Sequence, residues 1–157
     1  MKGFFVFLAL AFMISVIPYS YAETLRQSME GGMDLEIKYP KSVMKERLFS
    51  ISVLLQNNGW ENKQDISFIL SNPDGAFISH GDNTIIIDEL TPRSSFGTTI
   101  DYQVSKTANE GSRFLNIDYR QVLVSNNIDP MEPTQTNIAL PITIIGEPVI
   151  VLSLIHI

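Results

Sequence analysis

The stretch ISVLLQNNGWENKQDISFIL, Ile51–Leu70, decides the fold class, because apolar and polar residues alternate at both of its ends. The alternation covers 48–56 and resumes over 66–70, and a period of two places every second side chain on one face of a β-strand. Between them lies the polar segment Asn57–Gln64, which is longer than the loop of a tight hairpin. We therefore predict two strands that are neighbours in sequence and cross from one sheet to another.

Alternating apolar residues predict further strands on both sides of this stretch. The sequence Asn72-Pro73-Asp74-Gly75 predicts a hairpin turn followed by a short return strand at 76–78, because Pro fixes φ and Gly accepts a left-handed conformation. Pro141 lies inside the last strand and cannot donate a ladder hydrogen bond, which predicts an edge strand or a bulge. The other predicted strands are 33–40, 84–90, 96–104, 115–124 and 138–145.

About seven to eight short strands without a convincing helix are typical of an antiparallel β-sandwich. We assign this all-β domain to residues 33–146. The preceding residues 23–32 are polar, end in a Gly pair and lack an apolar period, so we expect a flexible lead-in. A segment of two prolines and no period, 125–136, is expected to be a loop.

The order of these features resembles the immunoglobulin-like CARDB and NEW3-type domains of exported archaeal and bacterial surface proteins. The resemblance covers about 33–146 and rests on NNG, NPDG, IDELTPRSS before a Thr-rich strand, GSRFLNIDY and the closing LPITIIGEP. It implies a fibronectin III-like sandwich without a disulfide, one of several tandem modules ahead of a membrane anchor, with no catalytic residue. The lead-in and QVLVSNN are similar to membrane-anchored exported proteins of ammonia-oxidising archaea.

The amino terminus has the pattern of a secretory signal. Lys2 precedes the apolar run FFVFLALAFMISVI, and Ser20 and Ala22 supply small residues before a cut between Ala22 and Glu23. The run is shorter than the roughly 20 residues of a spanning helix, so we expect 1–22 to be a cleaved signal peptide and not an anchor. The protein is then exported, to the extracellular space or the cell surface.

The last residues, 147–157, end in the uncharged segment VIVLSLIHI. An unpaired apolar strand is an aggregation hazard. We therefore expect the start of a truncated next module or an artefactual tail, since SLIHI resembles translated sequencing-adapter sequence. A real last strand or the start of an anchor is the alternative.

The composition restricts the function classes. The formal net charge is −6, and removing the signal peptide with Lys2 leaves −7, which disfavours nucleic acid and anionic membrane surfaces as partners. Contact with the membrane is then expected only through the signal peptide or a missing carboxyl-terminal anchor. The absence of cysteine excludes thiol catalysis, thiolate zinc sites and disulfides.

No motif points to catalysis, a cofactor or a metal. His80 lies in a polar turn and His156 in the tail, and neither sits in a hydrolytic pattern. Loop carboxylates raise the possibility of calcium, but their spacing does not fit an EF-hand, and a solvated acidic surface is the simpler interpretation. These carboxylates are Asp74, Asp82, Asp88, Glu89, Asp129 and Glu132.

Trp60 is the only tryptophan and lies in the polar crossing with Asn57 and Asn58. An exposed indole could stack on a sugar or anchor a protein contact, whereas a buried one would close the open end of the core. We expect the buried arrangement, with the two asparagines as turn residues. Function is expected to be that of a non-enzymatic module contacting protein or cell-envelope components, and the alternative is a carbohydrate-binding or accessory domain of a secreted enzyme.

Overall fold

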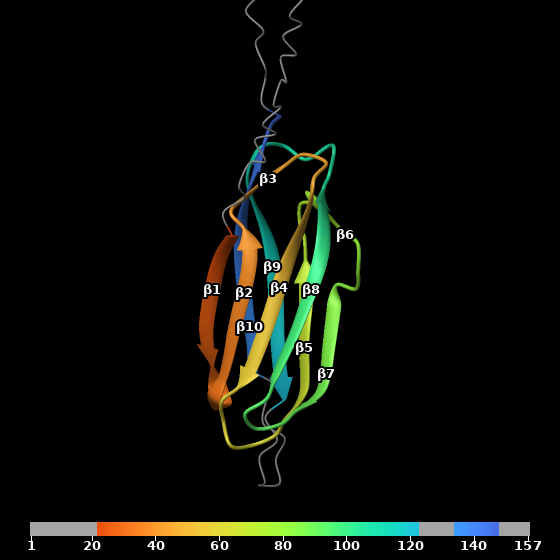
Figure 1. Cartoon of the computed structure of the whole chain (residues 1–157). Coiled ribbons are helices and arrows are strands. Elements are labelled where there is room, and N and C mark those ends of the chain that lie inside the picture. The colour runs from red at the N-terminus through yellow and green to blue at the C-terminus, as the bar shows by residue number, and fades with distance from the viewer. Residues whose placement is uncertain (1–21, 123–133, 148–157) are drawn as a thin grey trace, which may run out of the picture.

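The computed structural model describes residues 22–122 and 134–147. These residues form ten β-strands in two facing sheets, joined by turns, with one short 3-10 segment, η1 (Glu30–Gly32) (Figure 1). The strands are β1 (Ala22–Met29), β2 (Met33–Pro40), β3 (Ser42–Met44), β4 (Leu48–Asn57), β5 (Lys63–Ser71), β6 (Phe77–Ser79), β7 (Thr84–Leu90), β8 (Ser95–Val104), β9 (Gly111–Val122) and β10 (Thr134–Ile145). Among the described residues, no helix has the length and hydropathy needed to cross a membrane.

The strand order is that of an immunoglobulin-like sandwich. One sheet has the order β1-β2-β4-β8-β6 and the other β3-β10-β9-β5-β7. All pairings are antiparallel except that of β3 with β10, because the chain changes sheets after Pro40 and β3 joins the opposite layer. The predicted immunoglobulin-like, fibronectin III-like β-sandwich is confirmed. The two strands not predicted are β1 and β3.

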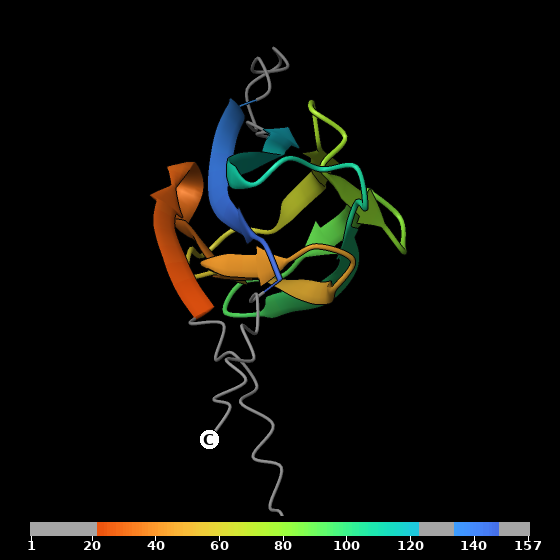
Figure 2. The same cartoon turned by 90° about the horizontal axis from the view of Figure 1, so that it is seen from above.

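The two sheets face each other (Figure 2). The core lies between them and is made by the alternating apolar residues read from the sequence. Along β2, for example, Met33, Leu35 and Ile37 are buried while the residues between them face outward. Phe68 and Tyr119 pack with ring centroids 5.2 Å apart, both fully buried. Burial of such side chains contributes about 1.5–3 kcal/mol each, which explains how the fold manages without disulfides.

The expectation of a flexible lead-in over 23–32 is wrong, because all of these residues lie in β1 or η1. Strand β1 pairs with β2 over its full length, from Ala22↔Pro40 to Met29↔Met33. Its residues alternate between exposed and half-buried, with Leu25 and Met29 packed against the core. Such an edge strand is mostly polar, so its apolar period is too weak to stand out in the sequence.

The crossing between β4 and β5 does connect the two sheets, as predicted. The turn Asn72–Gly75 does so as well, and the predicted hairpin there is wrong: β5 belongs to one sheet and β6 to the other. The turn itself has the expected chemistry, since Gly75 has φ 66° and its N–H donates to the Asn72 carbonyl at 3.2 Å. The residues of a turn do not indicate which of the two sheets the following strand joins.

Strand β10 carries Pro141 at an open edge, as predicted. Pro141 lies opposite Phe114 of β9, whereas β3 covers only Thr143–Ile145 on the other side of β10. The N–H of Thr143 donates to Lys41 O at 2.9 Å on that outer side, and residue 141 has the same orientation. The missing N–H of proline therefore breaks no ladder bond. Most of the predicted loop 125–136 lies outside the described residues, and Thr134–Thr136 belong to β10.

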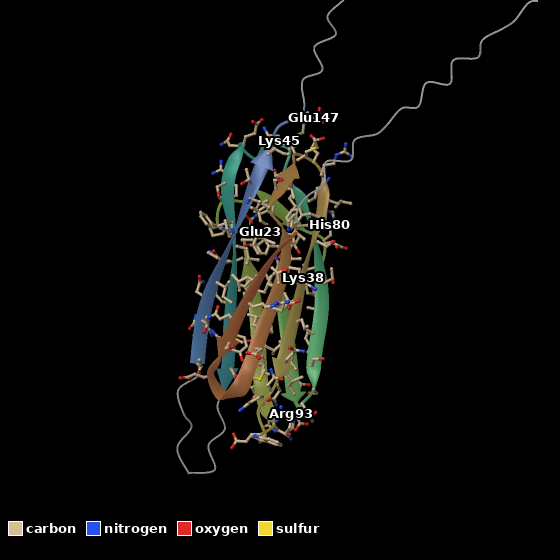
Figure 3. The ribbon with its side chains drawn as sticks, turned by 60° about the vertical axis from the view of Figure 1, so that its left-hand side comes forward. Glu23, Lys38, Lys45, His80, Arg93 and Glu147 are labelled. Carbon is tan, nitrogen blue, oxygen red and sulfur yellow. The ribbon has the colours of Figure 1, made fainter. Side chains whose placement is uncertain are left out.

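The described chain begins and ends at the same end of the sandwich. Ala22 pairs with Pro40, and the next residue, Lys41, bonds to Thr143 near the end of β10. Figure 3 places Glu147 and Lys45 at this end and Arg93 at the opposite one. The reason is β1, which adds one antiparallel passage before β2 and so reverses the direction in which the chain enters the fold.

Candidate functional site

Three connections meet at the end of the sandwich opposite Glu147. They are the crossing 58–62 between β4 and β5, the turn 91–94 between β7 and β8, and η1 between β1 and β2. We call these segments, with the adjoining Asn57 and Lys63, the distal tip. Figure 3 shows Arg93 of the tip at the far end of the long strands from Glu147.

Asn57 holds the crossing in shape and is completely buried. Its side-chain Nδ2 donates to Glu61 O at 2.8 Å and to Leu90 O at 2.9 Å, and its Oδ1 accepts from the N–H of Gly59 at 3.1 Å. One amide thus closes the turn and ties it to the end of β7. A buried amide with this many partners is a structural element and is not available to a ligand.

Backbone contacts join the other two connections to the crossing. The N–H of Arg93 donates to Asn57 O at 2.8 Å, and the N–H of Asn58 donates to Gly32 O at 2.8 Å. Gly59 lies so close to η1 that an added Cβ would be 2.8 Å from Gly31 O. The tip is therefore a tightly connected unit in which glycine is required at 59.

Trp60 projects from this unit into solvent, with 83% of its surface exposed. The guanidinium of Arg93 lies over the indole at 4.3 Å from the ring centroid, within the range of a cation–π contact. Arg93 reaches it from a backbone with φ 63°, the left-handed region. The expectation that Trp60 closes the core is wrong, since Asn57, Lys63 and Leu90 are buried at this end without the indole.

The residues next to Trp60 in the sequence carry polar side chains. Glu61 is largely exposed and its carboxylate is 3.7 Å from Nζ of the buried Lys63. Asn62 donates to Glu89, and Asn58 donates to Asp34 Oδ2 at 2.6 Å. An aromatic ring, a guanidinium and several amides and carboxylates can bind a ligand by stacking and hydrogen bonding.

The structure gives different roles to the three residues singled out from the sequence. Asn57 is structural, Asn58 is an exposed hydrogen-bonding residue, and Trp60 is exposed. Sequence reasoning missed Arg93, because its contact with Trp60 joins two loops that are distant along the chain. The sequence Thr-Pro-Arg-Ser signalled only a turn. The predicted cleavage pair Ala22 and Glu23 lies at the start of β1, where Glu23 Oε2 accepts from the Tyr39 hydroxyl at 3.0 Å.

The other sequence candidates do not assemble into a reaction centre. His80 is exposed, and its backbone N–H donates to Asp101 O at 2.9 Å. Within residues 22–122 and 134–147, no group of three or more His, Asp or Glu side chains is placed to hold a metal ion. His156, Asp129 and Glu132 lie outside the described residues.

Comparison with known proteins gives little guidance. No family model and no curated protein matches the chain. Among solved structures, one neighbour is described as "AvmM Catalyzes Macrocyclization in Alchivemycin A Biosynthesis". It has 7% sequence identity and a TM-score of 0.45, and the match covers 83% of this chain and 100% of that one. A likeness this distant carries no information on activity or ligand.

Proposed function

We propose that this chain is a non-catalytic, exported cell-surface module that binds protein or other cell-envelope components through its distal tip. Its immunoglobulin-like sandwich would be one of several tandem CARDB or NEW3-type domains of a membrane-anchored protein. Export rests on the signal sequence of residues 1–22. The position of β1 is compatible with it, because the strand begins at Ala22 and a cut after that residue would leave the pairing from Glu23 onward intact.

The observation that carries the proposal is the exposure of Trp60. A tryptophan that is 83% exposed forgoes the free energy of burying a large apolar surface. Trp and Arg are, with Tyr, the residue types enriched at the energetic centres of protein interfaces. Here both are presented together on a tip that Asn57 and Gly59 hold in one shape, so little conformational entropy would be lost on binding.

The location of the tip also favours recognition. Because the described chain begins and ends at the opposite end, a tether on either side of it would leave the distal tip at the far end from the attachment. Strand β10 has 12 residues, and at about 3.3 Å per residue the tip would stand about 40 Å from the attachment.

A carbohydrate-binding domain is the second candidate, and the same indole supports it. Arg93 covers one face of the ring, and the high exposure requires that another part of the indole is open. A pyranose ring can stack on such a face, while the amides of Asn58 and Asn62 could bond hydroxyl groups. The two candidates predict different partners for one surface.

Binding to isolated cell envelopes of the organism that encodes the chain tests the proposal. The exported, fluorescently labelled protein is compared with Trp60→Ala and with the matched control Ile86→Ala, which removes an apolar side chain that is 69% exposed on β7. We expect Trp60→Ala to weaken binding more than about tenfold and Ile86→Ala to leave it unchanged. Equal binding of the two variants would contradict the role of the tip.

Treating the envelopes separates the candidates. Protease treatment should abolish binding if the partner is a protein, and glycosidase treatment should abolish it if the partner is a glycan. Export is tested independently by expressing the full chain and measuring the intact mass of the secreted product, which should begin at Glu23. Ala22→Phe should block processing, because the position before the cut requires a small residue, whereas Thr24→Phe should not.

A further inference from the structure

Strand β8 has an open edge. Strand β6 covers only Phe77–Ser79, and it pairs with residues 102–104 of β8. In the part of the chain that the structure describes, residues 95–101 of β8 have β4 on one side and no strand on the other. This stretch contains neither lysine nor proline, the residues that commonly protect an edge from pairing.

Neighbouring hydrogen bonds identify the backbone groups that face the open side. Ser94 O accepts from Asn57 N at 2.9 Å, so even-numbered residues direct their polar backbone groups toward β4. Asp101 O accepts from His80 N at 2.9 Å, so odd-numbered residues direct theirs toward the open edge. The N–H and C=O groups of Gly97 and Thr99 therefore face outward along the edge, in position for a further strand.

A pocket of about 350 Å³ lies against the same edge. It is bounded by residues 98–101 of β8, the turn 80–82 and the start of β7. Ile85 and Ile100 supply its apolar lining, Asp82 and Asp101 its two carboxylates and His80 one imidazole, while no lysine or arginine lines it. Asp101 lies on the outer face of the sheet, where its Oδ1 accepts from the Ser50 hydroxyl at 2.6 Å.

We propose that the β8 edge binds an extended peptide segment, which adds to the sheet as a further strand beside Gly97 and Thr99. Successive side chains of a strand point to opposite faces. One set of the peptide's side chains would enter the pocket against Ile85 and Ile100, and β-branched apolar residues suit that position. The other set would lie beside Asp101 on the outer face, where lysine or arginine would pair with the carboxylate. The partner is therefore a segment that alternates apolar and basic residues.

This proposal concerns a different surface from the distal tip and does not depend on what the tip binds. Its test uses the exported chain and a short acetylated and amidated peptide that alternates Val with Thr and Lys. Binding is measured by titration with detection of backbone amide signals by NMR. We expect saturable binding, with shifts and slowed hydrogen exchange at the Gly97 and Thr99 amides.

Two changes test the edge directly. Thr99→Pro removes an outward N–H without removing a bond to β4, and it should weaken binding at least about fivefold. The matched control is Thr24→Pro, where the substitution lies on β1 and binding should be unchanged. Should Thr99→Pro fail to fold, N-methylation of the peptide backbone tests the same bonds with the protein intact and should weaken binding similarly.

Replacing Lys by Glu in the peptide should also weaken binding, and this difference should shrink at high salt. The proposal would be overturned by an absence of binding or by amide shifts that map to another surface. It would also be overturned if N-methylated and unmodified peptides bind equally. Sedimentation that finds a dimer of the chain which Thr99→Pro dissociates would indicate a second copy at this edge in place of the peptide, and would likewise overturn the proposal.

Discussion

Replacing Asn57 should be among the most destabilising single changes at the distal tip. Asn57→Ala removes three hydrogen bonds, to Glu61 O, to Leu90 O and from Gly59 N, at distances of 2.8, 2.9 and 3.1 Å. Each typical hydrogen bond contributes about 1 kcal/mol, so the loss of all three amounts to about 3 kcal/mol. We expect the free energy of unfolding to fall by about 2–4 kcal/mol.

Asn57→Asp refines the test because it keeps the size of the side chain. The carboxylate could still accept from the Gly59 N–H, but it would face the two carbonyl oxygens to which the amide now donates. We expect a loss at least as large as for Asn57→Ala near neutral pH. At acid pH the protonated carboxyl group could donate one bond again, so the loss should become smaller.

Urea unfolding followed by far-UV circular dichroism measures these differences. Asn58→Ala is the matched control, because its amide is exposed and bonds only to Asp34 among the contacts described, at 2.6 Å. An exposed pair of this kind should contribute less than about 1 kcal/mol. If Asn57→Ala and Asn58→Ala were equally stable, the inference that Asn57 organises the tip would be refuted.

Three further predictions follow from single contacts. Gly59→Ala should lower the free energy of unfolding by about 1–3 kcal/mol, because its Cβ would meet Gly31 O at 2.8 Å, whereas Gly81→Ala, with nothing within 4 Å, should be nearly neutral in the same urea assay. Arg93→Ala should change the fluorescence of Trp60 without unfolding the sandwich, and an unchanged spectrum would argue against the stacked pair. Burial raises the pKa of the Tyr119 hydroxyl, so the folded state retains its proton when the unfolded state loses it. The contribution of Tyr119 to stability should thus be constant below about pH 10 and decrease above it by up to about 1.4 kcal/mol per pH unit, and Tyr119→Phe should reduce the slope of stability against pH in alkaline denaturation curves.

Much of the fold was predictable because the alternation of apolar and polar residues within a strand indicates which of its faces is buried. The predicted bounds of 33–40 and 84–90 are those of β2 and β7. The two strands that were missed lack a clear alternation. Strand β1 is half-buried at most, and β3 has only three residues, of which Val43 is buried. The sheet that receives each strand depends on pairing between distant segments, which explains the error at Asn72–Gly75.

The candidate site was predictable only in part. The sequence singled out the crossing and its tryptophan, because a large aromatic residue among polar neighbours is unusual. It did not indicate that Asn57 would occupy the end of the core or that Arg93 would reach the indole. Both depend on the docking of β7 and β8 against the crossing, through the bonds to Leu90 O and from Arg93 N.

The shared end of the described chain has a mechanical consequence. A force applied between Ala22 and Glu147 would load β1 and β10 where they meet the rest of their sheets, at the pairs beginning with Ala22↔Pro40. The hydrogen bonds there would break one after another, because the force would not load them all at once in shear. The sandwich should therefore offer little resistance to tension applied between these two residues.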